Sequence, residues 1–255
     1  MLLVMDVGNT NTVLGIYEGN RLRASWRITT RREQTADEYG VFIENLLQSA
    51  GLGPKDVTAV ALSSVVPTVQ PVLEETANNY FGITPFVVKP GVNVSIPLLI
   101  DTPRELGADR VVNAVAAIAL YGAPLIIVDF GTATTFDAIS PSGEFLGGAI
   151  APGLVIASEA LFQRGSQLFR VELTLPSHVI GTNTTEAMQS GILYGYAGLV
   201  DGILERMIHE TGGSPRVVAT GGLAPAVQKE TKRIHEVNLN LTLEGLRIIY
   251  ERSFS

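Results

Sequence analysis

The chain has 255 residues, 46% hydrophobic and 17% charged, which is a globular composition with enough apolar material for a substantial core. A formal net charge of −7 argues against a basic surface that captures nucleic acid, and the apolar runs are too interrupted to span a membrane. Cysteine is absent, which excludes disulfides and thiolate metal sites, and Asp6 ends the apolar start before a signal peptide forms. We expect a cytoplasmic protein.

The first part of the chain alternates strand-like and helix-like segments. Apolar patterns predict strands at residues 2–5, 12–17, 21–28, 57–63 and 84–88. Gly19-Asn20 is a hairpin signal between the second and third of these strands. Helical patterns occupy residues 35–49, 69–80 and 108–120, and Thr35 with Glu38 has the spacing of a capping box at the first of them.

The second part repeats this alternation. Strands are predicted at residues 125–128, 134–139, 145–150 and 216–220, and helices at 153–162, 184–211 and 243–253. The run Ser140-Pro-Ser-Gly143 supplies the turn of a second hairpin.

The two parts open with the same motif. An apolar strand leads to Asp6-Val-Gly-Asn-Thr-Asn-Thr12 in the first and to Asp129-Phe-Gly-Thr-Ala-Thr-Thr135 in the second, and a hairpin follows each time. This internal repeat predicts two similar α/β halves, which we divide as residues 1–120 and 121–255. A cleft between such halves is a preferred ligand site.

The Asp-x-Gly motif suits phosphate chemistry. A glycine after a buried strand lets backbone N–H groups approach an anion, and the Asn and Thr side chains add hydrogen-bond donors. The aspartate cannot contact phosphate without repulsion, so its natural partner is Mg²⁺ through water. A single Asp-x-Gly is common, whereas a pair at the starts of two repeats is much more specific. The chain has neither a P-loop motif nor a GxGxxG motif.

Three further clusters have both a structural and a functional interpretation. Gly107-Ala-Asp-Arg110 opens a predicted helix, where Asp109 is either a simple helix-dipole acid or a catalytic one. Residues 147–153 form a glycine-rich turn into a helix, suited to tight packing or to an anion. Thr220-Gly-Gly222 follows a late strand and is either an ordinary turn or a surface for a flat base.

Taken in this order, the Asp6, Gly107, Asp129 and Thr220 motifs resemble the motif set of the type III pantothenate kinases, and the resemblance covers almost the whole chain. It implies an actin-like (ribonuclease H-like) duplicated fold with two similar halves around a nucleotide cleft. It also implies ATP-dependent phosphorylation of pantothenate, the first step of coenzyme A biosynthesis. Members of this family are usually homodimers, with the pantothenate pocket near the partner subunit.

The resemblance also implies a role for each motif. Asp109 would be the catalytic proton acceptor, Asp129 would hold a monovalent cation (K⁺ or NH₄⁺), and Asp6 would hold Mg²⁺ through water. The residues implied in ATP binding are Asp6, Val7, Gly8, Asn9, Thr10, Asn11, Thr12, Val13, Thr132, Thr220, Gly221 and Gly222. Those implied in pantothenate binding are Gly107, Ala108, Asp109, Arg110 and Thr184.

One stretch departs from the family pattern. The family often has an aromatic residue before the Gly-Ala-Asp-Arg motif, where this chain has Ile100-Asp-Thr-Pro103, so a hydroxyl contact to the substrate is missing. Two other functions remain open at this point. One is a kinase for a sugar or short acid, or a phosphatase of the same fold, since fold does not fix the substrate. The other is a regulatory ATP-binding protein without catalysis, against which the intact Asp6, Asp109 and Asp129 argue.

Overall fold

The computed structural model describes residues 1–165 and 168–254. The chain divides into two compact units, Met1–Leu120 with Asn240–Ser255 and Tyr121–Leu239. Each has a five-stranded mixed sheet of its own. We expected the halves to be 1–120 and 121–255. The difference lies at the C-terminal end, where the last helix joins the first unit.

The sheet of the first unit has the order β3-β2-β1-β4-β5. Its strands are β1 (Leu2–Val7), β2 (Asn11–Glu18), β3 (Arg21–Thr29), β4 (Ala59–Ser64) and β5 (Phe86–Val87). The first three are antiparallel neighbours, whereas β4 is parallel to β1 and β5 is parallel to β4. The predicted hairpin between β2 and β3 is present, and Gly19 at its turn has φ of 55°, a conformation that glycine adopts at no steric cost.

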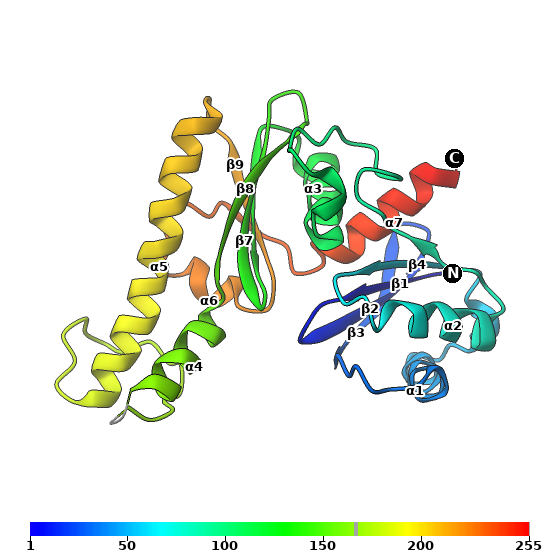
Figure 1. The fold of residues 1–255 in the computed structure, drawn as a ribbon, viewed down its shortest axis with the longest axis horizontal. Coiled ribbons are helices and arrows are strands. Elements are labelled where there is room, and N and C mark those ends of the chain that lie inside the picture. Colours follow the sequence, from blue (N-terminus) through cyan, green and yellow to red (C-terminus); the bar gives the residue numbers. More distant parts are fainter. Residues whose placement is uncertain (166–167, 255) are drawn as a thin grey trace. The chain divides into compact units, whose positions relative to one another are not determined.

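Helices cover both faces of this sheet. They are α1 (Ala36–Ser49), α2 (Gln70–Phe81), α3 (Ala108–Tyr121) and α7 (Leu241–Phe254), with short 3₁₀ turns at Pro54–Asp56 and Pro103–Glu105. One core cluster lies under α1 and α2, and another joins α7 and α3 to the opposite face (Figure 1). The predicted capping box is confirmed, because the Thr35 side chain accepts from the Glu38 backbone and Glu38 bonds back to the Thr35 backbone.

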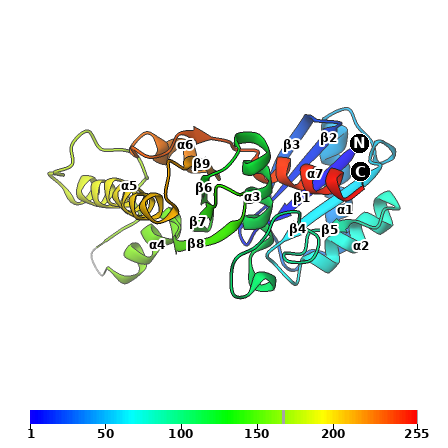
Figure 2. The same cartoon turned by 90° about the horizontal axis from the view of Figure 1, so that it is seen from above.

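The terminal helix α7 belongs to the first unit because of its packing. It lies over β1, β2 and β4 (Figure 2), and its Leu243 and Leu246 are buried against them. Gly245 permits close approach to α3, since a Cβ there would lie 2.2 Å from the Val112 carbonyl oxygen. Thr242 Oγ1 also donates to Asn113 Oδ1 at 2.7 Å. Position in the chain alone does not reveal these long-range contacts.

The second unit repeats the topology of the first, with strand order β10-β9-β6-β7-β8. Its strands are β6 (Leu125–Phe130), β7 (Ala133–Ile139), β8 (Phe145–Pro152), β9 (Arg216–Thr220) and β10 (Glu236–Val237). The central strand β6 has an antiparallel hairpin neighbour on one side and the parallel β9 on the other, as β1 has in the first unit. The internal repeat seen in the sequence is therefore a repeat of structure.

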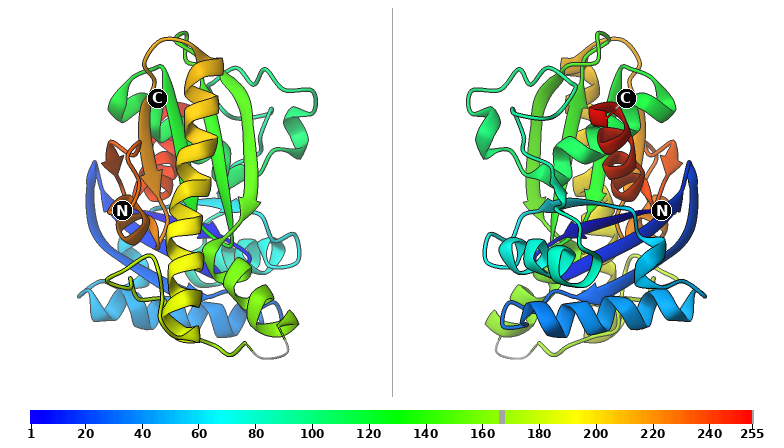
Figure 3. Two further views of the ribbon diagram at one scale, coloured as in Figure 1. Left: turned by 90° about the vertical axis from the view of Figure 1, so that its left-hand side faces the viewer. Right: turned by 90° about the vertical axis from the view of Figure 1, so that its right-hand side faces the viewer.

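The helices of the second unit are α4 (Leu154–Arg164), α5 (Thr184–Thr211) and α6 (Ala224–Gln228). The long α5 runs along the β6–β7 part of the sheet (Figure 3, left) and buries Tyr196, Val200 and Leu204 against it. The short elements α6 and β10 have no counterpart among the sequence predictions. Among the described residues, no helix combines the length and apolarity that a membrane crossing requires.

Candidate active site

The first Asp-x-Gly loop joins β1 to β2 and is closed by its own backbone and by Thr30, which follows β3. Gly8 N donates to Asn11 O at 3.0 Å, and Thr30 Oγ1 donates to Gly8 O at 2.7 Å. Thr12 is fully buried, and its hydroxyl lies 2.9 Å from Thr30 Oγ1. Thr12 therefore stabilises the loop from below, whereas Asn9 and Thr10 are exposed at its tip, where they can contact a ligand.

Asp6 lies at the carboxyl end of β1 and faces a hydroxyl on the neighbouring strand. Asp6 and Ser63 are partners in the parallel β1–β4 register, and Ser63 Oγ donates to Asp6 Oδ1 at 2.6 Å. This bond fixes the rotamer of the carboxylate at the mouth of the loop. Ser63 was not among the predicted site residues, but the repeat contains a signal for it, since Thr220 occupies the matching position opposite Asp129.

Asp109 lies in the first turn of α3, close to the first loop. A Cβ at Gly107 would lie 2.4 Å from Asp109 Oδ1 and 3.7 Å from Val65 Cγ1, so this carboxylate packs over Gly107 beside Val65. Val65 N in turn donates to Val7 O at 3.0 Å. The structure thus brings the Gly107–Arg110 motif to the end of β1, where the first loop begins.

The surroundings of Asp109 alter its acidity. Burial raises the pKa of the Asp109 carboxyl, because a charged carboxylate loses hydration there. The Arg110 backbone N–H, which donates to Asp109 Oδ1 at 2.8 Å, and the Arg110 guanidinium partly offset this effect. The carboxylate is consequently a stronger base than an ordinary aspartate and is better suited to accept a proton from an alcohol.

Arg32 is a second residue that the sequence did not assign to the loop. Arg32 follows β3 and is exposed. Its Nη2, however, lies 3.4 Å from Asn9 Oδ1, a long hydrogen bond that holds the guanidinium beside the first loop. A positive charge is therefore available near a loop that contains no Lys or Arg of its own.

In the second unit, the Asp129 and Thr220 motifs lie side by side. Asp129 pairs with Thr220 in the parallel β6–β9 register and with Thr135 across the β6–β7 hairpin. Gly221 has φ of 90°, and a Cβ there would lie 2.7 Å from Asp129 Oδ1 and 2.6 Å from Phe130 O. Only glycine fits this position without strain.

The glycine-rich turn before α4 also packs on the second loop. A Cβ at Gly153 would lie 2.3 Å from Thr132 O and 2.7 Å from Gly131 O, so the start of α4 lies directly against the loop backbone. The structure therefore favours the packing interpretation of this turn. Gly131 and Thr132 themselves are exposed, as Asn9 and Thr10 are in the first loop.

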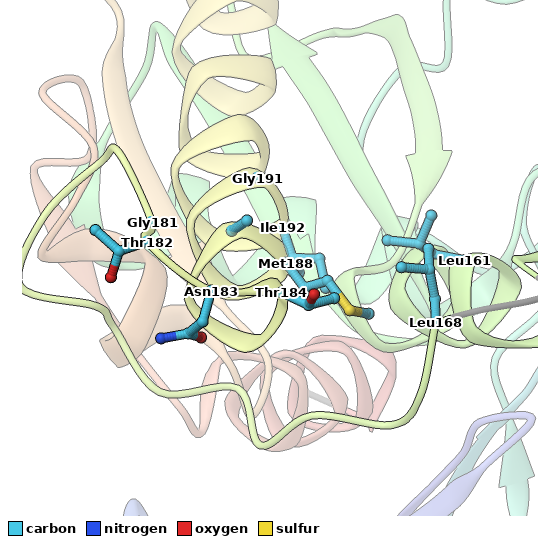
Figure 4. A pocket seen from close by; sticks show the side chains of 10 residues that line it. Leu161, Leu168, Gly181, Thr182, Asn183, Thr184, Met188, Gly191 and Ile192 are labelled. Atoms are coloured by element: carbon cyan, nitrogen blue, oxygen red, sulfur yellow. The ribbon is translucent and has the colours of Figure 1, made fainter.

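Thr184 is the first residue of α5, in the second unit. Asn183 caps this helix by accepting from Glu186 N at 2.9 Å, and hydrogen bonds from Thr182 lower the pKa of Glu186. Thr184 lines a cavity of about 560 Å³ between the start of α5 and the segment that follows α4. In Figure 4, Thr184 and Met188 lie between Asn183 and the pair Leu161 and Leu168.

Two groups of predicted residues thus form local sites, one per unit. The first loop and Gly107–Arg110 meet in the first unit, and Asp129, Thr132 and Thr220–Gly222 meet in the second. Across residues 1–165 and 168–254, no three His, Cys, Asp or Glu side chains form a metal cluster. Any metal bound by these described residues therefore relies on one or two carboxylates with hydroxyl, backbone or ligand oxygens.

Comparison with known proteins adds the family. A sequence profile of type III pantothenate kinases matches residues 2–206. The chain is 57% identical over 253 residues to a type III pantothenate kinase of Geobacter sulfurreducens and 56% identical over 253 residues to one of Myxococcus xanthus, and each match covers 99% of both chains.

Solved structures extend the likeness to the fold. A conserved Baf family transcriptional activator from Campylobacter jejuni has a TM-score of 0.61 at 18% identity, covering 98% of both chains. An N-acetylglucosamine kinase from Porphyromonas gingivalis has a TM-score of 0.51 at 13% identity, covering 100% of both. These distant likenesses agree with an actin-like fold of two similar halves, as predicted. The extent and identity of the sequence matches show that this chain belongs to the type III pantothenate kinase family.

Proposed function

We propose that this protein transfers the γ-phosphoryl group of ATP to the primary hydroxyl of pantothenate, giving 4′-phosphopantothenate in the first step of coenzyme A biosynthesis. The observation that carries the proposal is the Gly107–Arg110 motif at the end of β1, which places a carboxylate of raised pKa beside an Asp-x-Gly loop. Membership of the family supplies the identity of the acceptor.

ATP is proposed to bind to both loops. The exposed tips, Asn9-Thr10 and Gly131-Thr132, are proposed to contact the phosphate oxygens. Thr220-Gly-Gly222 is proposed to lie against the nucleoside part, and Gly221 packs this segment closely on Asp129 and the Phe130 carbonyl. Phosphoryl transfer passes through a loose transition state, so these contacts act mainly by positioning and by charge neutralisation.

A divalent metal fits the first loop by its chemistry. Mg²⁺ prefers oxygen ligands and keeps several waters, and the Asp6 carboxylate is held in one orientation by Ser63 at the loop entrance. Asp6 would hold hydrated Mg²⁺, which supplies positive charge to the phosphates when bound. The residue's own task is to fix that charge at the carboxyl end of β1.

A monovalent cation fits the second loop. Thr135 Oγ1 is buried and has no hydrogen-bond partner, and Thr135 stands opposite Asp129 in the β6–β7 register. An unpartnered hydroxyl oxygen beside a carboxylate is a suitable environment for K⁺ or NH₄⁺, because the cation satisfies the oxygen that the fold leaves unpaired. Asp129 would hold this cation, with Thr135 beside it.

Asp109 is proposed to accept the proton of the attacking hydroxyl. Its raised pKa brings the carboxyl nearer to the working pH, and its hydrogen bond with Arg110 N fixes its direction. Arg110 is proposed to bind the pantothenate carboxylate, and Thr184 to contact the same substrate. Ile100 supplies no hydroxyl contact, so we expect the remaining polar groups to carry recognition of pantothenate.

We also propose a cytoplasmic homodimer. Apolar side chains are exposed on α4, on α5 and on the segment between them, and Ile180 in that segment is 85% exposed. The others are Val155, Ile156, Leu161, Phe169, Leu175, Val179 and Leu199. Exposed apolar surface of this kind is typical of an interface. Ile180→Glu is expected to give monomers in analytical ultracentrifugation, and an unchanged sedimentation coefficient contradicts this choice of surface.

The proposed reaction is tested by coupled ADP release with pantothenate, ATP and Mg²⁺, first in K⁺ and then in Na⁺ alone. Turnover that requires pantothenate and falls sharply without K⁺ is the expected result. Folded protein that binds ATP but gives no turnover in K⁺ rules out pantothenate as the acceptor. In that case, sugars and short hydroxy acids are the next acceptors to assay.

A further inference from the structure

Tyr196 connects the long helix α5 to the second loop. Its ring is buried, with 6% exposure, and packs at a centroid distance of 6.3 Å against Phe130, which comes directly after Asp129. Its hydroxyl is hydrogen-bonded to Thr134 Oγ1, which is fully buried on β7. None of the motifs in the sequence pointed to this tyrosine.

Thr134 is well placed to transmit that contact. It is the β7 partner of Phe130 in the hairpin register, and it follows the exposed Thr132 by two residues. Fixing Thr134 therefore fixes the point at which the loop returns to the sheet. The corresponding Thr12 of the first loop is fixed instead by Thr30, which directly follows the neighbouring strand β3.

The ring of Tyr196 also shares a buried cluster with the start of α4. Leu154, the first residue of that helix, belongs to the same cluster as Tyr196 and Phe130. The preceding residue, Gly153, packs against the Thr132 and Gly131 carbonyl oxygens. Tyr196 thus bonds to β7 through its hydroxyl and packs near the start of α4 through its ring, and both elements adjoin the second loop.

A purely structural role for Tyr196 would not require its hydroxyl group. Burial of the ring would stabilise the unit whether the residue were Tyr or Phe, and Phe would avoid burying a hydroxyl that needs partners. Here the hydroxyl bonds to Thr134, on the strand to which the loop returns. This contact lies beside the proposed ATP site rather than within the packing between helices.

We infer that Tyr196 is a positioning residue for ATP, and that it holds the second loop in its phosphate-binding conformation through its hydrogen bond to Thr134 and its packing against Phe130. This inference rests on the proposed role of the loop in binding ATP. Tyr196 does not touch the nucleotide in this scheme. It restricts the positions that Gly131 and Thr132 adopt, so its loss weakens ATP binding without affecting the acceptor site.

The test uses the full-length enzyme and the variants Tyr196→Phe, Thr134→Val and their combination, each of which removes hydroxyl groups while keeping shape. We expect each single variant to raise the KM for ATP about fivefold to tenfold, as loss of one buried hydrogen bond does. KM for pantothenate should change less than about twofold. The double variant should be no worse than either single variant, because all three lose the same contact.

Tyr194→Phe is the matched control on the same helix. The Tyr194 hydroxyl donates to Pro176 O at 3.1 Å, in the segment before α5, so its loss should lower Tm and leave the KM for ATP unchanged. If Tyr196→Phe does not fold, Thr134→Val alone decides the question. Folded variants with wild-type KM for ATP, or additive effects in the double variant, overturn the inference.

Calorimetric titration with ATP, without an acceptor, separates this inference from the proposed reaction. ATP binding that weakens in Tyr196→Phe supports the inference even if pantothenate is not phosphorylated. Pantothenate turnover with unchanged ATP affinity in the variants overturns the inference and leaves the reaction standing. A wild-type protein that binds no ATP overturns both.

Discussion

The two Asp-x-Gly loops arise from the same strand and hairpin arrangement but are stabilised in different ways. The first is held mainly by the other strands of its own sheet, through Thr30 after β3 to Gly8 and Ser63 on β4 to Asp6. The second is held from outside its hairpin, by Gly153 before α4, by Gly221 after β9 and by Tyr196 on α5. The two loops share a motif, but different neighbouring elements stabilise them.

The turns themselves also differ. Four residues separate the last β1–β2 pair, Val7 and Thr12, whereas three separate Phe130 and Thr134 in the second hairpin. Gly8 N accordingly bonds to Asn11 O, and Gly131 N to Ala133 O. The shorter second loop is packed against more neighbours, so substitutions far from it in sequence should disturb it. The first loop should respond mainly to changes within residues 6–30 and at Ser63.

The largest effect is expected at Asp109, the acid that accompanies only the first loop. Asp109→Asn keeps the shape of the side chain but cannot accept a proton, so kcat should fall about 1,000-fold, which corresponds to about 4 kcal/mol. ATP affinity, measured by calorimetric titration, should remain within about twofold of wild type. Equal losses in kcat and ATP affinity would contradict a role confined to the acceptor.

The second-largest effect is expected at Asp129, and it distinguishes this aspartate from Asp6 in the first loop. Asp129→Asn should abolish stimulation by K⁺, and kcat/KM should fall about 100-fold because a positive charge near the phosphates is lost. K⁺ should also raise the Tm of the wild type but not of this variant, a readout independent of activity. Asp6→Asn is the matched variant in the first loop and should retain K⁺ stimulation while requiring more Mg²⁺. Identical ion responses in the two variants would remove the distinction between the loops.

Glycine substitutions compare the packing of the loops directly. Gly221→Ala forces a side chain into a left-handed backbone and onto the Phe130 carbonyl, so it should cost about 2 kcal/mol of stability or more and raise the KM for ATP about tenfold. Gly8→Ala meets Asn11 O at 3.0 Å without a positive φ, so its effect on KM should be about threefold or less. For both variants, thermal denaturation measures the change in stability, and activity titrations with ATP measure the change in KM. A larger effect at Gly8 would reverse the proposed order.

Much of this architecture could be predicted from local sequence. The hairpins, the capping box at Thr35 and the duplication were all visible, because turn residues, cap residues and apolar periodicity are local signals. The strand predicted at 84–88 is shorter in the structure, Phe86–Val87. Two elements were missed, α6 and β10, which have five and two residues and therefore too little periodicity to detect.

The residues that support the loops were harder to predict. Thr30, Ser63 and Tyr196 lie 22, 57 and 62 positions from the residues they hold, so only the folded sheet brings the partners together. Ser63 could have been found by asking what matches Thr220 in the repeat. Tyr196 had no such signal, since the first unit holds Thr12 by a threonine that directly follows β3.

The smallest predicted effect is the pH dependence of stability caused by Asp109. Burial raises its folded pKa above the unfolded value, so the folded state binds more protons between those two values, and the free energy of unfolding falls as the pH rises through that window. Asp109→Asn removes the free-energy cost of burying the charged carboxylate. The variant should have a higher Tm than wild type at pH 7, and the difference should shrink as the pH approaches the unfolded pKa of about 3.9. Asp101→Asn, which changes an exposed acid of the same unit, is the control and should show a smaller difference with pH. A variant less stable than wild type at pH 7 would mean that the stabilising contacts of the carboxylate outweigh the cost of its desolvation. Asp109 would then be a structural acid at the start of the helix rather than a proton acceptor.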